Sequence, residues 1–335
     1  MTRFDSQGGY AANGEFQVIL LSFLVEIVKG EGNQPVLNFA NQGDKCSKFP
    51  GTELFKCPEI EQTTLPLYHL SRRSNNSRRE DIQTCQTKHN KTILLSIGGA
   101  TYSEGGFIST NSAVSTADKI WEMFGHYTLT STINRPFGNA CVDGFDFDIE
   151  ANSLNMDVFA NKLRKNMDGD QHSSLTAGND GSIRRFYLSA APQCPQPDWY
   201  TKDILERVRL DMVFVQFYNN YCGVSAFVQD VDDPQPLFNL KDWNNWAKHD
   251  AVNKNVKVFV GVPGNANAGS GYASQDKLGG VVKYSTRFDS FAGIMVWDAS
   301  SAWGNGDFIS DVKKYLKDGG GKGHRVARGR LGGRG

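Results

Sequence analysis

Seven short runs of aliphatic and β-branched residues constrain the fold of this 335-residue chain more than any other feature. Stretches of helical or polar character separate the runs along the chain. Several runs are almost continuously apolar, which is typical of parallel strands that helices cover on the outside. The runs are Phe16–Leu24, Thr92–Ile97, Cys141–Ile149, Phe186–Ala191, Met212–Phe217, Val256–Val262 and Gly293–Trp297.

The stretches between the runs include three with helical periodicity: Ala113–Tyr127, Asp157–Met167 and Asp307–Leu316. Alternating strands and helices predict an α/β fold with right-handed crossovers, either an open sheet or a barrel. Seven strands at this spacing favour a TIM (β/α)8 barrel with one strand unaccounted for.

Two segments interrupt the alternation, and we predict that both are insertions in a barrel domain that spans residues 17–317. Residues 62–79 carry four Arg and no acid, and residues 168–185 are rich in Gly, Ser, Asn and Asp, as in a long loop. Residues 1–16 form an atypical N-terminal segment without the apolar stretch of a signal peptide. Residues 318–335 are predicted to be a disordered tail rich in Gly and Arg.

The distribution of charge argues against a nucleic-acid partner. The formal net charge is zero, but the five cations of the tail leave residues 1–318 with a net charge of −5. An acidic body of this kind does not suit a polyanion. The tail resembles basic, Gly-rich RNA-binding segments, yet it has neither repeats nor aromatic residues, and we interpret it as solvated. No apolar run reaches the roughly 18–20 residues that a membrane span needs.

The segment Asp143–Glu150, with the sequence Asp-Gly-Phe-Asp-Phe-Asp-Ile-Glu, carries the strongest chemical signal. Side chains alternate along a strand, so Asp146, Asp148 and Glu150 share one face and the intervening apolar residues share the other. Burying three carboxylates is costly unless a site uses or compensates their charge. In a barrel they would point inward, with Glu150 at the carboxyl-terminal mouth where active sites lie.

Two simpler interpretations of this segment compete with an active site. A row of carboxylates could bind Ca²⁺, but an EF-hand loop needs different spacing and a Gly at its sixth position. A solvated polar face would not explain the flanking Phe and Ile on an apolar strand. We therefore expect a functional carboxylate cluster without a metal ion.

The segment resembles the Asp-x-x-Asp-x-Asp-x-Glu signature of the family-18 glycoside hydrolases, the chitinase family. Further motifs resemble those of the plant and fungal class III branch, the hevamine-like chitinases, in the same order along the chain. They are Ser96-Ile-Gly-Gly99, Ala190-Ala-Pro-Gln-Cys-Pro195, Gln216-Phe-Tyr-Asn219 and Met295-Val-Trp297.

The resemblance implies a retaining, substrate-assisted hydrolysis without an enzymic nucleophile or a cofactor. Glu150 would protonate the glycosidic oxygen while the acetamide of the substrate attacks the anomeric carbon. Asp148 would orient the acetamide and balance the charge of the oxazolinium intermediate. Asp146 would share a proton with Asp148, and Tyr218 would donate its hydroxyl to the acetamide oxygen.

The resemblance also implies a set of substrate-binding residues around the mouth of the barrel. Trp297 would form an apolar floor under the sugar, because a flat indole suits a pyranose face. The other members of the set are Gln216, Gly98, Gly99, Phe23 and Asn38.

The six Cys indicate a few disulfides rather than a disulfide-built scaffold. The resemblance implies two of them, which pair Cys46 with Cys57 and Cys194 with Cys222. Cys85 matches half of a third family pair whose partner belongs to a first segment that this chain lacks. Cys141 is interpreted as a small buried hydrophobe.

The chain departs from the family pattern at its start, because Phe16–Leu24 resembles the second strand of the family and not the first. We therefore expect a TIM barrel whose first strand is missing or replaced. Such a barrel would keep open strand edges beside its mouth, and we expect it to be less stable than a closed one.

The expected function is that of an extracellular, monomeric endochitinase that cleaves β-1,4 bonds between N-acetylglucosamine units of chitin or its oligosaccharides. One alternative is a catalytically weak or inactive relative that only binds chitin or another carbohydrate. A second is an endo-β-N-acetylglucosaminidase that acts on N-glycan cores.

Overall fold

The structure of the chain is a computed structural model that describes residues 16–30, 33–39, 47–48, 55–56, 80–128, 130, 132–171, 185–231 and 234–319. Four sequence predictions fall largely on other residues. The N-terminal segment 1–15, the insertion 62–79, residues 172–184 and the tail 320–335 lie outside the described part.

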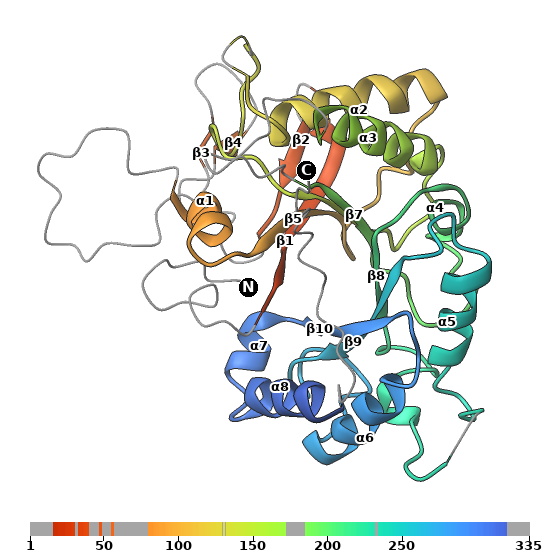
Figure 1. The fold of residues 1–335 in the computed structure, drawn as a ribbon. Helices are drawn as coiled ribbons and strands as arrows, with labels where there is room; N and C mark the ends of the chain where they lie inside the picture. Colours follow the sequence, from red (N-terminus) through yellow and green to blue (C-terminus); the bar gives the residue numbers. More distant parts are fainter. Residues whose placement is uncertain are drawn as a thin grey trace, which may run out of the picture.

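Within the described residues, one eight-stranded sheet forms the centre of the fold, and each of the seven predicted runs supplies one of its parallel strands (Figure 1). Along the sheet the order is β10-β9-β8-β7-β6-β5-β1-β2, and only β2 is antiparallel to its neighbour. The strands are β1 (Val18–Gly30), β2 (Gln34–Leu37), β5 (Thr92–Gly98), β6 (Gly144–Asp148), β7 (Tyr187–Ala190), β8 (Met212–Gln216), β9 (Lys257–Pro263) and β10 (Phe291–Trp297). A separate antiparallel pair consists of β3 (Ser47–Lys48) and β4 (Phe55–Lys56).

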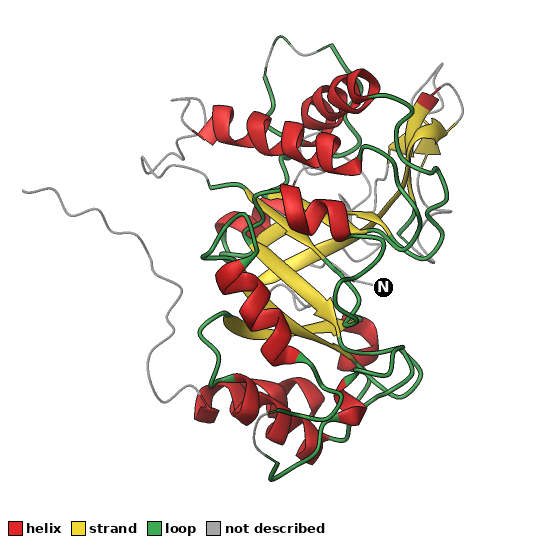
Figure 2. Cartoon of the chain, turned by 90° about the vertical axis from the view of Figure 1, so that its right-hand side faces the viewer, coloured by secondary structure: helices red, strands yellow, loops and turns green. Residues whose placement is uncertain are grey.

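Helices follow the parallel strands and cover the outside of the sheet, as Figures 1 and 2 show from two directions. This alternation of strand and helix confirms the predicted α/β barrel class. The helices are α1 (Glu80–Thr87), α2 (Thr110–Phe124), α3 (Met156–Gln171), α4 (Lys202–Arg207), α5 (Leu240–His249), α6 (Gln275–Ser285), α7 (Ala299–Trp303) and α8 (Phe308–Gly319), with a 3-10 turn at Val224–Ala226.

Helix α3 ends four residues inside the segment 168–185 that the sequence predicts as a loop. Two contacts explain the extension, one within α3 and one with the neighbouring helix. Asp168 pairs with Arg164 one turn earlier at 2.7 Å, and Asp170 accepts a hydrogen bond from the indole of Trp121 on α2 at 2.9 Å. The loop-like composition of this segment is therefore overridden by contacts with the neighbouring helix.

Strand β6 is buried on both faces. Helices α2 and α3 cover the outward face. Phe145 and Phe147 are fully buried, and Ile149 is 2% exposed. The ring of Phe145 meets Trp121 of α2 at 6.2 Å, and that of Phe147 meets Phe159 of α3 at 6.1 Å. The predicted alternation is confirmed: apolar residues lie under the helices, which leaves the inward face to the carboxylates.

A smaller apolar cluster fills the barrel interior below the mouth. Its four buried members come from three segments: Leu94 of β5, Ala191 directly after β7, and Met212 and Phe214 of β8. Val18 and Leu20 of β1 and Met295 of β10 pack against this cluster but are only partly buried. Tyr187 of β7 and Phe259 of β9 also pack against it and are partly buried.

No described strand joins β10 to β1, so the ladder of the described barrel is open at this seam. Ring contacts connect the two sides instead. Phe23 of β1 lies 5.7 Å from Trp297 at the end of β10, and Phe16 lies 6.4 Å from Trp303 of α7, measured between ring centroids. The predicted loss or replacement of the first strand concerns residues 1–15, which lie outside the described part of the chain, and it stays a prediction.

We expect backbone amides of β10 that face the seam to exchange with solvent much faster than those of β6. The reason is that β6 has a ladder on both sides, whereas the described partner of β10 is β9 alone. Hydrogen–deuterium exchange resolved to single residues measures the difference. Equal protection of alternate amides along Phe291–Trp297 and along β6 would contradict it.

Candidate active site

Asp146 lies inside the barrel on β6, and each of the two neighbouring strands supplies a hydroxyl group that donates to its carboxylate. The register aligns it with Ser96 on β5 and Ser189 on β7. The hydroxyl of Ser96 donates to one carboxylate oxygen at 2.7 Å, and that of Ser189 donates to the other at 2.6 Å. Asp146 is completely buried, and burial raises its pKa, while the two hydroxyls and the N–H of Phe147 lower it.

Asp148 lies two residues further along the same face and nearer the mouth. The side-chain amide of Gln216, at the end of β8, donates to it at 2.9 Å and also donates to the carbonyl of Ala191 at 2.9 Å. Burial raises the pKa of Asp148 well above its usual range, and the charges of Glu150 and Asp146 raise it further. At least part of this cluster therefore holds protons where isolated carboxyl groups would be ionised.

Glu150 follows the carboxyl end of β6 and is half-buried at the rim. Its pKa is raised by burial first and by the charge of Asp198 second. A half-buried carboxyl group with a raised pKa can reach a substrate and still carry a proton. This combination is what a general acid requires.

Tyr218 follows β8 and is 5% exposed. Burial raises the pKa of its phenol well above the usual value, and the charges of Asp148, Glu150 and Asp146 act in the same direction. The hydroxyl therefore stays protonated and available as a hydrogen-bond donor. The four side chains with predicted catalytic roles are brought together at one end of the barrel.

Gly98, the last residue of β5, and Gly99, which follows it, allow the backbone to approach Asp148 and Phe23 closely. The N–H of Gly99 donates to the carbonyl of Asp148 at 2.7 Å, and the φ angles of Gly98 and Gly99 are 115° and 81°. A Cβ on Gly98 would lie 2.1 Å from the Asp148 carbonyl oxygen, and a Cβ on Gly99 would lie 2.8 Å from the Phe23 ring. Any side chain here would collide with the site.

Phe23 and Trp297 form an aromatic pair at the mouth, with ring planes 30° apart. Both are half-buried, so part of their surface remains accessible. Asn38 exchanges two backbone hydrogen bonds of 2.9 Å with Phe23, and its side chain is exposed. The structure thus places Asn38 beside the pair through its backbone, and a direct role for its side chain remains a prediction.

Sequence reasoning missed three residues of the site: Ser96, Ser189 and Asp198. Ser96 opens the Ser-x-Gly-Gly motif, and its alignment with Asp146 could have been found by placing the two motif strands side by side. Ser189 belongs to an apolar run and gives no such signal. Asp198 lies in the connection after β7, and the sequence pattern does not distinguish it from a surface acid.

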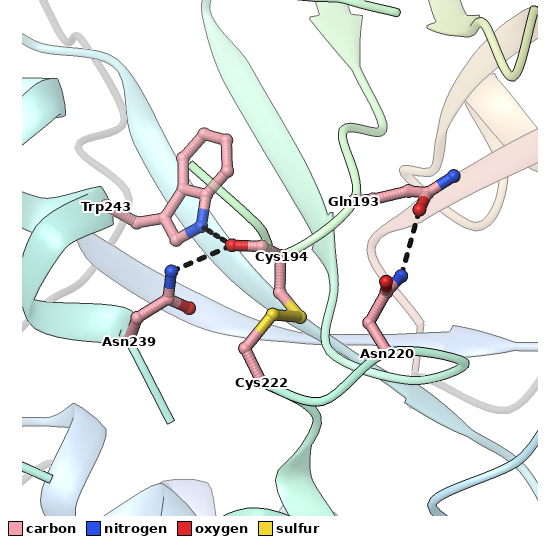
Figure 3. The surroundings of a disulfide bond; sticks show 6 residues. All are labelled: Gln193, Cys194, Asn220, Cys222, Asn239 and Trp243. Carbon is pink, nitrogen blue, oxygen red and sulfur yellow. Dashed lines mark hydrogen bonds between the residues drawn. A yellow bond between two sulfur atoms is a disulfide. The ribbon is translucent and has the colours of Figure 1, made fainter. Parts of the chain in front are cut away.

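The predicted disulfide between Cys194 and Cys222 is present and ties the connection after β7 to the one after β8 (Figure 3). Gln193 and Asn220 reinforce the link through a side-chain hydrogen bond of 2.9 Å. Asn239 and Trp243 both donate to the carbonyl of Cys194, which anchors the link to α5. Cys46 and Cys57 lie outside the described residues, whereas Cys85 and Cys141 are described and buried.

The carboxylate oxygens of this site face donors of the protein. Asp146 accepts from two hydroxyls and Asp148 from an amide. In the described part of the chain, no group of three or more His, Cys, Asp and Glu side chains is arranged to hold a metal ion. None of the described helices is long and apolar enough to cross a membrane.

A parallel barrel with a row of carboxyl groups rising to its carboxyl-terminal mouth is the architecture of a barrel glycoside hydrolase. The sequence profile of glycosyl hydrolases family 18 matches residues 39–299, and the chain belongs to this family. The match begins before β5 and ends just beyond Trp297, so it contains the whole carboxylate motif.

Two curated relatives and one solved structure are similar over most of the chain. A class III chitinase of Arthroderma benhamiae is 46% identical over 91% of this chain and 84% of its own length. Endochitinase 33 of Trichoderma harzianum is 40% identical over 92% of this chain and 85% of its own. The xylanase and α-amylase inhibitor protein of Scadoxus multiflorus is 26% identical, with a TM-score of 0.64 and coverage of 92% and 91% of the two chains.

We expect Asp148→Asn to stabilise the fold at neutral pH by about 1 kcal/mol, because the amide fits the same space and requires neither a buried charge nor the uptake of a proton on folding. The pKa of Asp148 is raised in the folded state, so the native chain binds its proton more tightly than the unfolded chain does. The wild type must therefore lose stability as the pH rises from the unfolded pKa toward the folded one, and the variant must not.

Urea unfolding of both proteins across this pH range measures the gap between their free energies of unfolding. The gap should close at acidic pH, where Asp148 is protonated in both states. A gap that is constant with pH, or a variant that is less stable at neutral pH, would contradict the assignment.

Proposed function

We propose that the chain is an endochitinase that hydrolyses β-1,4 bonds between N-acetylglucosamine units of chitin, with retention of configuration. The observation that carries this proposal is the meeting of Glu150, Asp148 and Tyr218 at one barrel mouth. The chitinase names of the two curated relatives support the choice of chitin as the substrate.

Glu150 is the proposed general acid. It lies at the rim, where it can reach the oxygen between two sugars, and burial together with nearby negative charge favours its protonated form. Proton transfer to that oxygen converts it into a better leaving group as the glycosidic bond breaks.

The acetamide of the substrate is the proposed nucleophile. Its carbonyl oxygen attacks the anomeric carbon and forms an oxazolinium ion, which water then opens. The positive charge of this ion develops beside Asp148, whose buried position strengthens the attraction. Tyr218 remains protonated and would hold the acetamide oxygen by a hydrogen bond, while Asp146 would exchange a proton with Asp148 as the charge changes.

Trp297 and Phe23 are proposed to support the apolar face of the sugar at the cleavage point. Gln216 fixes the orientation of Asp148 by donating to it, and Gly98 and Gly99 leave room for the chain of sugars. The disulfide between Cys194 and Cys222 and the chitinase relatives support an extracellular location, since disulfides persist in oxidising compartments.

A binding protein without activity is the second candidate, because an inhibitor protein shares this fold at a TM-score of 0.64. The complete set of Glu150, Asp148 and Tyr218 favours catalysis, since binding alone does not require an acid with a raised pKa. An assay of new reducing ends on chitin oligomers, run beside a chitin-binding assay, separates the two.

We expect Glu150→Gln to lower turnover of chitin oligomers by about 10²–10⁴-fold, the usual contribution of a general acid. Binding of the oligomers should change little, because the amide has the same size. Glu206→Gln serves as the matched control, since Glu206 lies on α4 with a side chain that is 51% exposed. Retention of most activity in the Glu150 variant would remove this residue from the role.

We expect fully deacetylated chitosan to resist hydrolysis, because it lacks the acetamide nucleophile. With chitin oligomers, the first product observed by NMR should be the β-anomer, and an oxazoline-like thiazoline should inhibit strongly as a mimic of the intermediate. Rapid cleavage of chitosan, or first appearance of the α-anomer, would exclude the substrate-assisted route.

A further inference from the structure

The turn between α1 and β5 carries the sequence Asn90-Lys91-Thr92 (Figure 1). An Asn followed two positions later by Thr or Ser is the acceptor pattern for N-linked glycosylation, in which a bulky, hydrophilic sugar chain is attached to the Asn side chain. The pattern also occurs by chance in unmodified proteins, so its value depends on where the fold places the acceptor.

Asn90 lies in an exposed turn whose backbone is fixed directly after it. Its side chain is exposed, and its φ angle of 53° lies in the left-handed region that Asn adopts more readily than most residues. The N–H of Lys91 donates to the carbonyl of Cys85 at 2.8 Å, and that of Thr92 donates to the carbonyl of Gln17 at 2.9 Å. The turn thus holds the acceptor at the surface, where a large polar group displaces no packed neighbour.

Thr92 is the first residue of β5 and pairs with Val18 of β1. A β-branched side chain suits this half-buried strand position. Val would meet that need as well as Thr does, whereas N-glycosylation requires the hydroxyl group. The fold alone therefore accounts for the shape of residue 92, and glycosylation accounts for its hydroxyl.

The acceptor lies at the opposite end of the barrel from the carboxylates. Asn90 precedes the amino end of β5, whereas Glu150 follows the carboxyl end of its parallel neighbour β6. The register pairs Gly98 with Asp148, and the strand from Thr92 to Gly98 is about 20 Å long at roughly 3.3 Å per residue. A glycan at Asn90 therefore leaves the mouth open to a chain of sugars.

We propose that Asn90 is a site of N-linked glycosylation, which places a glycan on the end of the barrel opposite the active-site mouth. The inference rests on the proposed extracellular location, because the donor is met in the secretory pathway. The donor is an oligosaccharide linked to a lipid diphosphate. The amide nitrogen of Asn90 bonds to the anomeric carbon and loses a proton, while the bond from that carbon to oxygen breaks and the lipid diphosphate leaves.

The test secretes the full chain from yeast behind an added signal peptide and maps the occupied Asn. Cleavage after Glu80 and Glu104 releases a peptide in which Asn90 is the only acceptor, apart from the second pattern at Asn75-Asn-Ser77 outside the described residues. A peptide N-glycosidase acting in water labelled with heavy oxygen converts a glycosylated Asn90 into labelled Asp, which mass spectrometry detects.

We expect the label in the wild type and in Thr92→Ser, which keeps the hydroxyl. It should be lost completely in Thr92→Val, which keeps only the shape. An unlabelled peptide from the secreted wild type, or a label that persists in Thr92→Val, would overturn the proposal.

Two Gly variants control for the turn itself. Asn90→Gly removes the acceptor but accepts the left-handed conformation, so it should lose the label without a loss of folding. Asn33 is also exposed, with a φ angle of 56°, but Pro35 stands where the pattern needs Thr or Ser. Asn33→Gly should therefore leave the label at Asn90 unchanged, and a label retained in Asn90→Gly would contradict the assignment.

Chitin turnover by the same preparations tests the proposed function separately. Removal of the glycan from the folded enzyme should leave the turnover of chitin oligomers unchanged, and a several-fold change would overturn the placement away from the mouth. Glycosylation at Asn90 in a chain without activity would refute the proposed function and leave the modification site established. Activity in a secreted chain with an unmodified Asn90 would overturn this inference alone.

Discussion

The burial of Asp146 and Asp148 inside the barrel is the constraint on which the rest of the site depends. A buried carboxylate is tolerated only where donors surround it, and here the donors come from three other strands. Ser96 of β5, Ser189 of β7 and Gln216 of β8 each point a hydrogen at one of the two acids. The parallel register of these strands with β6 is therefore a chemical requirement as well as a packing one.

Gln216 connects this constraint to the loops at the mouth. Its single amide group satisfies Asp148 and the carbonyl of Ala191, and its backbone pairs with the segment after β7. That segment carries the disulfide and Asp198. Gln216 thus joins the carboxylates of β6 to the connection after β7.

Much of the fold could be predicted from the sequence, because its information lies in local periodicity. All seven parallel strands match apolar runs, and the alternation of Phe145 to Glu150 placed the acids on the inward face. Features that depend on distant contacts could not be predicted. The pairing of Ser189 with Asp146 depends on a register set across a long crossover, the burial of Asp198 depends on a loop closed by a disulfide, and α3 is extended by Trp121 of another helix.

The buried acids also influence how a chain of this kind changes over generations. Desolvated negative charge lowers stability, so selection must act continuously to keep Asp146 and Asp148 for their chemistry. Once that selection is relaxed, a replacement of the same shape, such as Asp148→Asn, is favoured by folding itself. A barrel that keeps only its binding surface can therefore be more stable than the hydrolase, whereas restoring Asp148 costs folding free energy.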